Sequence, residues 1–393
     1  MRFPLVAART HVIPQHNAIP NPRLRNKPGA EGQAMKGENG VKYGMTLGQF
    51  ERGARTVPAL TASYLADLGE AKGKQELFKH QSPQILRALR ESAIVESAVS
   101  SSRIEGVLVR PARVAAVLRG RAALHDRAEE EVRGYRDALR LVHERGARLA
   151  VSEATVKRLH ELVRGEVWDA GNYREKAMDI IERYPNGRHR VRFSAVPAAS
   201  VASAVGELVV QWDANRTGQL VHPLVAAAAV NLDFLCIHPF RDGNGRVSRL
   251  LLLLQCYHLG FEVGRYVSLE RLIERNRDRY YETLESSSQR WHQGRHDPWP
   301  YINYILYILK SAYREFEERA SSTGSQRGAK TEAIVKVIQD QPGSFRVADV
   351  QRLAPAAGPD LIRHVLKHLQ AQGRVKCLGR GRSAQWRRTG EWN

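Results

Sequence analysis

One short stretch of the chain gathers residue types that handle phosphate esters. Residues 237–249 read IHPFRDGNGRVSR. His238 carries an imidazole that can take up a proton near neutral pH, and Asp242 offers carboxylate oxygens of the kind that Mg²⁺ binds beside phosphates. Arg246 and Arg249 stand three residues apart, so on a helix they share a face and both can bind phosphate oxygens. The stretch predicts a phosphoryl- or nucleotidyl-transfer site.

The elements on either side would present this stretch as an anion-binding loop. An apolar helix over Pro223–Ile237 must end at His238, because Pro239 disfavours helical geometry in the residue before it. A second helix, Asn244–Leu259, begins directly after the glycine loop, and a helix N-terminus favours anions through its free N–H groups and its dipole. The alternative is an ordinary loop between two helices in which the polar residues have no function. This alternative explains any one of the polar residues, but it explains their occurrence together poorly.

The stretch resembles the signature of the Fic (filamentation-induced-by-cAMP) family, HPFx(D/E)GNGRxxR, without a mismatch. The resemblance extends over about residues 41–320 and includes the run 171–174 (GNYR) and the tyrosine pair 280–281. It implies a protein adenylyltransferase (AMPylator), which transfers AMP from ATP to a Ser, Thr or Tyr hydroxyl of target proteins and of itself. One departure is Asn231, where many relatives have histidine, and we expect it to affect packing only.

The resemblance also implies a role for each residue of the motif. His238 would be the catalytic base that deprotonates the target hydroxyl, and Asp242 would hold Mg²⁺ beside ATP. Phe240 would anchor the loop in the core. Glycine at 245 would favour AMP transfer, because the kinase-like Doc branch has lysine there. The nucleotide-binding residues would be Phe240, Arg241, Gly243, Asn244, Gly245, Arg246, Arg249, Tyr280 and Tyr281.

A second motif lies upstream at residues 101–106 (SSRIEG) and resembles the inhibitory motif of the family, (S/T)xxxE(G/N). Ser101 and Glu105 are four residues apart and share a helix face, while Gly106 is suited to end that helix. The resemblance implies that Glu105 pairs with Arg249 and blocks productive placement of the γ-phosphate. Two alternatives stay open: a solvated glutamate at a surface helix end, and a de-AMPylase in which Glu105 positions water to remove AMP.

Two short runs, residues 178–182 and 190–193, predict a β-hairpin, because the Asn186-Gly187 pair between them is a strong turn signal. The alternative is an ordinary loop. The resemblance implies that the hairpin is the target-docking flap of the family, with Ile180 and Ile181 on it.

The whole pattern predicts a mainly α protein: a Fic helical bundle with a β-hairpin flap, plus a small C-terminal winged helix-turn-helix domain. The predicted parts are a disordered tail (1–40), an N-terminal helical extension with the inhibitory helix (41–125), the Fic catalytic domain (126–320), a Ser/Gly-rich linker (321–328) and the winged helix (329–393). A helix capped by Ser82 and Pro83 precedes the inhibitory motif. Further helices are predicted at 128–145, 153–167, 198–212, 269–286, 298–320, 331–340, 347–353 and 360–372.

The C-terminal module holds 12 basic and 5 acidic residues over 329–393. Its helix 360–372 would be a recognition helix, ended by Gly373. Exposed basic residues would be Arg363, His364 and Lys367 on the helix and Arg374, Lys376, Arg380, Arg382, Arg387 and Arg388 on the wing. DNA binding and protein contacts, including a homodimer, explain this module equally well. The rival for the whole chain is a DNA-binding regulator whose Fic domain senses nucleotide, although such a sensor has no need of His238 and Asp242.

Composition narrows the class of protein. The chain has 393 residues and a net charge of +20. This charge indicates either solvated, arginine-rich faces or a polyanionic partner, which would be nucleic acid or nucleotide phosphate. Three cysteines cannot build a disulfide framework, and the most apolar run, 250–254, is too short for a bilayer. These features argue against secreted and membrane-spanning proteins and predict a cytoplasmic one. The use of ATP, Mg²⁺ and a hydroxyl-bearing target protein is what the family resemblance implies.

Overall fold

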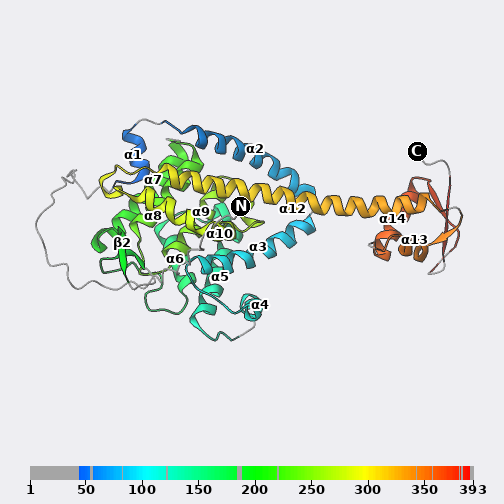
Figure 1. The fold of residues 1–393 in the computed structure, drawn as a ribbon, viewed down its shortest axis with the longest axis horizontal. Coiled ribbons are helices and arrows are strands. Elements are labelled where there is room, and N and C mark those ends of the chain that lie inside the picture. The colour runs from blue at the N-terminus through cyan, green and yellow to red at the C-terminus, as the bar shows by residue number, and fades with distance from the viewer. Residues whose placement is uncertain are drawn as a thin grey trace, which may run out of the picture. The chain divides into compact units, whose positions relative to one another are not determined.

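The computed structural model describes residues 44–53, 56–81, 83–120, 123–183, 188–218, 221–341, 343–355, 357–379, 381 and 384–389. The predicted tail 1–40, the helix cap Ser82 and the turn 186–187 lie outside these residues. The chain divides into a larger unit that ends at Phe316 and a smaller one that begins at Glu317. Both are mainly helical, as predicted (Figure 1).

The larger unit is a bundle of helices. In chain order they are α1 (Thr46–Arg52), α2 (Ala59–Gln81), α3 (Pro83–Ile104), α4 (Pro111–Arg119), α5 (Arg127–Arg145), α6 (Glu153–Arg164), α7 (Val201–Gly218), α8 (Pro223–Ile237), α9 (Asn244–His258), α10 (Leu269–Arg275), α11 (Arg277–Ser288) and α12 (Trp299–Gln339). Short 3₁₀ turns lie at Gly146–Arg148, Ala198–Ser200, Val263–Arg265 and Trp291–Gln293.

Local sequence explains where several of these helices begin. The side chains of Asp126, Ser152 and Ser268 accept hydrogen bonds from backbone N–H groups in the first turns of α5, α6 and α10. Helix α8 begins with Pro223 at its first position, where a missing N–H costs nothing.

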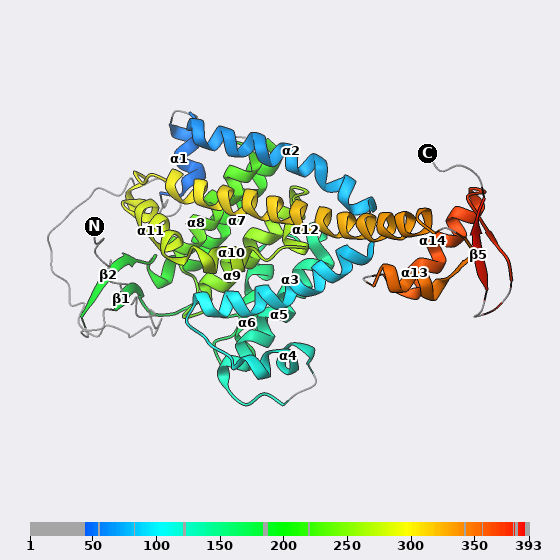
Figure 2. The ribbon, with the colours of Figure 1, turned by 45° about the vertical axis from the view of Figure 1, so that its right-hand side comes forward.

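The centre of the bundle is the pair α8 and α9, whose residues are almost all buried. Helix α9 packs against α5, α6 and α8, while α8 also packs against α1 and α7. Around this centre, α2 runs beside α12 (Figure 2), and Thr61 Oγ1 donates a 2.6 Å hydrogen bond to Asn303 there. A helix that is apolar all round belongs in a core, so the sequence PLVAAAAVNLDFLCI explains the position of α8.

The predicted hairpin is confirmed. Strands β1 (Asp179–Arg183) and β2 (His189–Ser194) pair antiparallel, with Ile180 opposite Phe193 and an irregularity between Ile180 and Ile181. A lone hairpin is marginally stable in water, so its contacts with the bundle must hold it.

Helix boundaries were predicted well in the core and less well elsewhere. The prediction for α8 is confirmed at both ends, and that for α9 differs by one residue. The single helix predicted over 269–286 is wrong, because the chain leaves helical geometry at Asn276, with φ −118° and ψ 33°, and forms α10 and α11 instead. The Asn276 side chain donates to the Leu272 carbonyl, a local bond that competes with the helix.

Residues 321–328 were predicted to be a linker, but they are helical. Helix α12 continues through them without a break from Trp299 to Gln339. Gly324 and Gly328 each cost about 1 kcal/mol relative to alanine in a helix, but the segment holds no proline. Helical turns on both sides remove the need for a new nucleus, so these modest costs do not end the helix.

The smaller unit contains the end of α12, β3 (Phe345–Arg346), α13 (Val347–Leu353), α14 (Pro359–Ala371), β4 (Val375–Cys377) and β5 (Gln385–Arg388). The strands form one antiparallel sheet in the order β3-β5-β4. Its core gathers Ile334, Ile338, Phe345, Val350, Ile362, Leu366, Leu369, Val375 and Trp386. The helices and the hairpin that follows them were predicted, whereas strand β3 was not. The assignment of this unit as a winged helix stays a prediction.

No helix within the described ranges is both long and apolar enough to cross a bilayer. The cytoplasmic location stays a prediction.

Candidate active site

A pocket of about 110 Å³ lies where α8 passes into α9. The end of α3, the hairpin, the loop after α8 and helix α11 form its walls. Predicted residues that line it are Glu105, Ile180, Ile181, His238, Arg241, Asp242, Gly243, Asn244, Gly245, Tyr280 and Tyr281. The fold therefore brings together four segments that are far apart in the sequence: Glu105, the hairpin, the loop 238–245 and the tyrosine pair 280–281.

His238 ends α8 in the left-handed region, with φ 50° and ψ 61°. A non-glycine residue in this region is uncommon, and such strain is typical of functional sites. Its ring Nδ1 lies 3.2 Å from the carbonyl oxygen of Leu235. A carbonyl only accepts, so this hydrogen bond needs the proton on Nδ1, which leaves the lone pair of the neutral ring on Nε2.

Arg174 fixes the backbone around His238. Its backbone N–H donates to the Pro239 carbonyl at 3.0 Å, and its guanidinium donates to the carbonyls of His238 at 2.8 Å and of Ile237 at 3.2 Å. Burial lowers the pKa of Arg174 to about 10, which still leaves the side chain charged at neutral pH. This contact explains why the GNYR run accompanies the motif.

Asn244 holds the loop closed. Its side-chain oxygen accepts a 2.9 Å hydrogen bond from the Phe240 N–H, and its side-chain nitrogen donates a 2.8 Å bond to the Phe240 carbonyl. Phe240 itself is fully buried and stacks on His160, with ring centroids 3.7 Å apart. Its burial is consistent with the expected role as an anchor of the loop, and it is not among the residues that line the pocket, so a part in nucleotide binding stays a prediction.

His160 on α6 supports the loop from behind, and the sequence did not reveal it. Its Nδ1 accepts from the Gly171 N–H at 2.9 Å, so its Nε2 carries the proton and donates to the Asp242 carbonyl at 3.0 Å. Burial lowers the pKa of His160 to about 4, so the ring is neutral at pH 7. A lone histidine on the buried face of a helix gives no signal that separates this role from ordinary packing.

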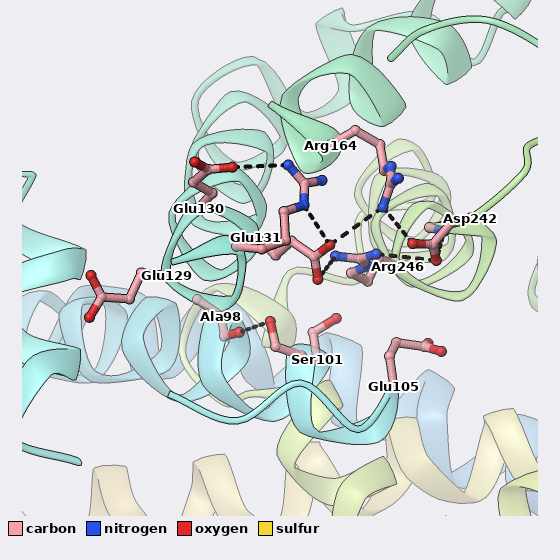
Figure 3. Close-up of polar contacts among 12 residues, drawn as sticks. Ala98, Ser101, Glu105, Glu129, Glu130, Glu131, Arg164, Asp242 and Arg246 are labelled. Atoms are coloured by element: carbon pink, nitrogen blue, oxygen red, sulfur yellow. Dashed lines mark hydrogen bonds and ion pairs between the residues drawn. The ribbon is translucent and has the colours of Figure 1, made fainter. Parts of the chain in front are cut away.

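Asp242 faces the pocket on one side and two arginines on the other (Figure 3). Its Oδ2 lies 2.5 Å from Arg164 and its Oδ1 lies 3.4 Å from Arg246, while about a third of its side chain stays exposed. No group of three or more His, Cys, Asp or Glu side chains suited to a metal occurs among the described residues. One exposed carboxylate fits Mg²⁺, which usually binds proteins through one or two carboxylates and otherwise takes phosphate and water oxygens.

Arg246 departs from the prediction. It is almost fully buried, and its guanidinium lies 2.9 Å from Glu131 on α5. Arg249, one turn further along α9, contacts α3 instead. The two arginines therefore have different neighbours, and in this arrangement Arg246 lies against Glu131 and Asp242, while its predicted contact with nucleotide phosphates stays a prediction.

Residues 101–106, which resemble the inhibitory motif of the family, lie at the end of α3 beside Arg249. Gly106 follows α3 with φ 81°, as a helix-ending glycine should. Arg249 is buried and donates to the Ser101 carbonyl and hydroxyl, both at 3.0 Å, and to Glu105 Oε1 at 2.9 Å. Burial opposes the charge of Arg249, yet its pKa is raised, chiefly because Glu105 lies beside it.

Gly245 lies directly beneath the carboxylate of Glu105. A Cβ added at position 245 would collide with Glu105 Oε1. The carboxylate therefore sits over the first turn of α9, where a helix favours an anion. Only a residue without a side chain leaves room for it.

The two tyrosines differ in their surroundings. Tyr280 is buried, whereas Tyr281 is half-buried and its hydroxyl donates a 3.2 Å hydrogen bond to the Ile104 carbonyl at the end of α3. Burial raises the pKa of Tyr281 well above its usual value, so the hydroxyl stays protonated. Tyr281 thus touches both the pocket and the inhibitory helix.

The hairpin is attached to α11 through Glu285. Arg190 lies 2.8 Å and Arg192 2.5 Å from its carboxylate. At the other end, Phe193 stacks on His292, with ring centroids 5.1 Å apart. These contacts place the strands, with Ile180 and Ile181, against the pocket.

Asn231, the one departure from the family pattern, is buried in α8. Its side chain donates to the Ser248 carbonyl at 2.6 Å and accepts from the Tyr301 hydroxyl at 2.7 Å. These bonds tie α8 to α9 and α12, in keeping with the packing role we expected.

Fold and site together define a class of protein: a helical bundle with a glycine loop at a buried helix N-terminus, beside a β-hairpin. Residues 150–256 match a family model described as the Fic/DOC family. The chain is therefore similar to the Fic/DOC family over these residues, which include α6, the hairpin, α8 and most of α9.

Two relatives bear the name protein adenylyltransferase Fic. The one from Nematostella vectensis is 24% identical over 253 residues, which cover 62% of this chain and 54% of the relative. The one from Drosophila willistoni is 26% identical over 214 residues, which cover 52% and 40%. The chain thus spans about half the length of these curated relatives.

Solved structures show the same fold. A Fic family protein from Desulfovibrio desulfuricans G20 aligns with a TM-score of 0.56 at 24% identity, covering 86% of this chain and 98% of that one. A Fic-domain signaling protein from Bacteroides thetaiotaomicron aligns with a TM-score of 0.55 at 17% identity, covering 65% and 97%.

Proposed function

We propose that this chain is an autoinhibited protein adenylyltransferase that transfers AMP from ATP to a Ser, Thr or Tyr hydroxyl. One observation supports this above all. His238, Asp242 and the first turn of α9 line a single pocket, and the Glu105–Arg249 pair lies at its anion-binding end.

His238 is the general base in this proposal. Its Nε2 takes the proton of the target hydroxyl while that oxygen attacks the α-phosphorus of ATP. A new O–P bond forms, the bond to the β-phosphate oxygen breaks, and pyrophosphate leaves. The Nδ1–H bond to Leu235 fixes the tautomer that this step requires.

The phosphates are held by the N-terminus of α9. The N–H groups of Asn244 and Gly245 lie in its first turn, where helical partners are missing. Arg249 supplies a buried positive charge once Glu105 leaves it, and Arg241 adds an exposed one at the rim. Arg246 acts from beneath, through Asp242 and Glu131.

Asp242 is the residue that would hold Mg²⁺. When bound, the ion supplies charge neutralisation between phosphate oxygens. Asp242 is itself kept in place by Arg164, by Arg246 and by the bond from His160 to its carbonyl.

The hairpin supplies the docking edge for the target. Ile180 and Ile181 border the pocket next to His238, so a peptide segment paired along β1 would bring its hydroxyl to the base. Strand addition of this kind uses backbone bonds and tolerates different target sequences.

Glu105 is the brake. Its carboxylate occupies the anion position over Gly245 and neutralises Arg249. The remaining volume of about 110 Å³ is smaller than the ~300–1,000 Å³ of usual small-molecule sites. An incoming phosphate would meet a like charge where it needs a cation, so nucleotide cannot settle productively until α3 shifts.

The experiment uses the Glu105→Gly variant with ATP labelled at the α- or the γ-phosphate. We expect label on protein only from α-labelled ATP, and a drop of about 10²–10⁴-fold on adding His238→Ala, the range typical of general base catalysis. Label from γ-labelled ATP would instead indicate phosphate transfer. Loss of AMP from a pre-labelled protein, dependent on Glu105, would indicate the de-AMPylase.

For the smaller unit we propose binding to nucleic-acid phosphates. Helix α14 buries Ile362, Val365, Leu366 and Leu369 and exposes Arg363, His364 and Lys367. Arg374 and Lys376 are exposed nearby in the sequence, as are Arg387 and Arg388 on β5, whereas Arg380 and Arg382 lie outside the described residues. The predicted homodimer stays a prediction.

A gel shift on random duplex DNA at two salt concentrations tests this second proposal. Affinity should fall as salt rises, because bound phosphates release counterions, and Arg363→Ala with Lys367→Ala should weaken it. No shift at low salt would leave protein contacts as the task of this unit.

A further inference from the structure

A buried carboxylate behind the pocket joins the arginines that hold Asp242 (Figure 3). Glu131 Oε2 lies 2.9 Å from Arg246, and its Oε1 lies 3.4 Å from Arg164 and 3.1 Å from Arg127. Arg164 and Arg246 are the same two side chains that contact Asp242. One carboxylate on α5 therefore fixes arginines from α6 and α9, which in turn fix the residue at the pocket.

Stability is a poor explanation for this cluster. Glu131, Arg164 and Arg246 are each at most 9% exposed. Removing charges from water is costly, and buried ion pairs are often no more stabilising than apolar residues of similar size. Their common feature is the contact with Asp242, whose side chain is 36% exposed and faces the pocket.

We propose that Glu131 is a positioning residue that sets how strongly Asp242 binds Mg²⁺. This rests on the proposed function, in which Asp242 is the metal-holding side chain. Glu131 neutralises Arg164 and Arg246 from behind and orients both. Asp242 thus keeps its orientation while part of its negative charge stays available to a cation in the pocket.

Loss of the Glu131 charge changes this balance in a definite direction. Arg164 and Arg246 keep their charges, because a guanidinium does not deprotonate in proteins. Asp242 is already the nearest carboxylate of Arg164 and then becomes the nearest one of Arg246 as well, with Asp169 further from Arg164 at 3.7 Å. A cation must displace more strongly bound guanidinium groups, so the Mg²⁺ requirement rises. Partners behind a metal ligand typically change metal affinity by about 10–100-fold.

The test measures binding of a non-hydrolysable ATP analogue by calorimetry over a series of Mg²⁺ concentrations. The full chain carries Glu105→Gly as the parent. We expect Glu131→Gln to raise the half-saturating Mg²⁺ concentration about 10-fold or more. The matched control is Glu130→Gln, on the same helix, which removes a more exposed partner of Arg127 at 3.0 Å and contacts neither Arg164 nor Arg246. It should leave the Mg²⁺ dependence unchanged.

A second variant separates electrostatics from damage to the fold. Adding Arg164→Gln to Glu131→Gln removes one excess positive charge and should return the Mg²⁺ requirement toward that of the parent. A fold defect would worsen in the double variant. Equal Mg²⁺ dependence in Glu131→Gln and the parent overturns the proposal. Asp242→Asn in the parent should abolish the Mg²⁺ dependence of ATP-analogue binding. If it does not, or if the parent shows no such dependence, the proposed role of Asp242 fails instead.

Discussion

The loop over residues 238–245 and the hairpin over residues 179–194 border the same pocket but are held in opposite ways. Buried groups that bond to backbone hold the loop: Arg174 donates to its carbonyls, and Asn244 closes it on Phe240. The hairpin is held through part-exposed ion pairs with Glu285. In the proposed function, the reacting groups thus lie on a firmly held loop, while the hairpin proposed to dock the target is held by weaker contacts.

The energies of these two kinds of contact differ. A buried polar group that loses its partner costs about 1–3 kcal/mol, and more when charge is involved. An exposed ion pair contributes about 0–1 kcal/mol. Substitutions in the loop should therefore lower stability, whereas those at the hairpin should change mobility and target recognition.

Arg174→Gln should have the largest effect on stability. The variant removes a charged donor from several buried carbonyls at once, and we expect a loss of at least about 3 kcal/mol in the free energy of unfolding. Denaturant unfolding of the full chain measures this. Arg190→Gln, on the hairpin and half exposed, is the matched control and should cost under about 1 kcal/mol. Similar losses in both variants would contradict the comparison.

The pH dependence of stability should also distinguish the buried bundle from the hairpin. In the bundle, Nδ1 of His143 on α5 lies 2.8 Å from the Tyr257 hydroxyl of α9. Burial lowers the pKa of His143 to about 3. Below pH 6.5 the His143 ring binds a proton in the unfolded chain but stays neutral in the folded chain. The free energy of unfolding therefore falls as the pH drops from 6.5 toward 3. The slope is about 1.4 kcal/mol per pH unit, or about 3 kcal/mol by pH 4.

The measurement is the loss of stability between pH 7 and pH 4, compared among variants. His143→Gln should remove about 3 kcal/mol of that loss, whatever its own cost at neutral pH. His189→Gln, at an exposed position of β2, should leave the loss as in the wild type. An unchanged pH dependence in His143→Gln would show that this ring is not held neutral by burial.

Asn244→Ala should cost about 1–3 kcal/mol, because the N–H and the carbonyl of Phe240 lose their partners inside the core. AMP transfer in the Glu105→Gly background should fall as well, since the loop then lacks its clamp. Asn172→Ala is the control, because Asn172 is exposed and its side chain donates a long hydrogen bond of 3.4 Å to the Ala170 carbonyl. A variant as stable and active as the control would rule out the clamp.

Glu285→Gln should have the smallest effect on stability, under about 1 kcal/mol, while loosening the hairpin. Hydrogen exchange in β1 and β2 should become several-fold faster, with exchange in α8 and α9 unchanged. Glu282→Gln, exposed on the same helix, should alter neither. Faster exchange in α8 and α9 would mean that Glu285 supports the bundle rather than the hairpin.

The features that could be predicted best from the sequence are those that depend on neighbouring residues in the chain. The motif at 238–249 is contiguous, so the helix boundaries on either side of it followed from residue order, while the burial of Phe240 was implied by the family resemblance. The pairing of Glu105 with Arg249 came from the family resemblance, and the structure has it at 2.9 Å.

The supports behind the site could not be predicted in this way. Glu131 and Arg164 stand 33 residues apart on different helices, and a chain with 61 lysines and arginines offers many equivalent pairings. The burial of Arg246 depends on Glu131 and was missed for the same reason. Breaks in helices were also misjudged, because Asn276 ended a helix and the glycines of 321–328 did not.

The most direct test of the proposed brake compares the wild type with Glu105→Gly for transfer of label from α-labelled ATP to the chain itself. ATP binding by both proteins is measured alongside. We predict a clear rise in labelling of Glu105→Gly, and a smaller rise for Glu105→Gln, which removes the charge but keeps the bulk over Gly245. If ATP binds to Glu105→Gly and labelling does not increase over the wild type, the contact between Glu105 and Arg249 is not a brake.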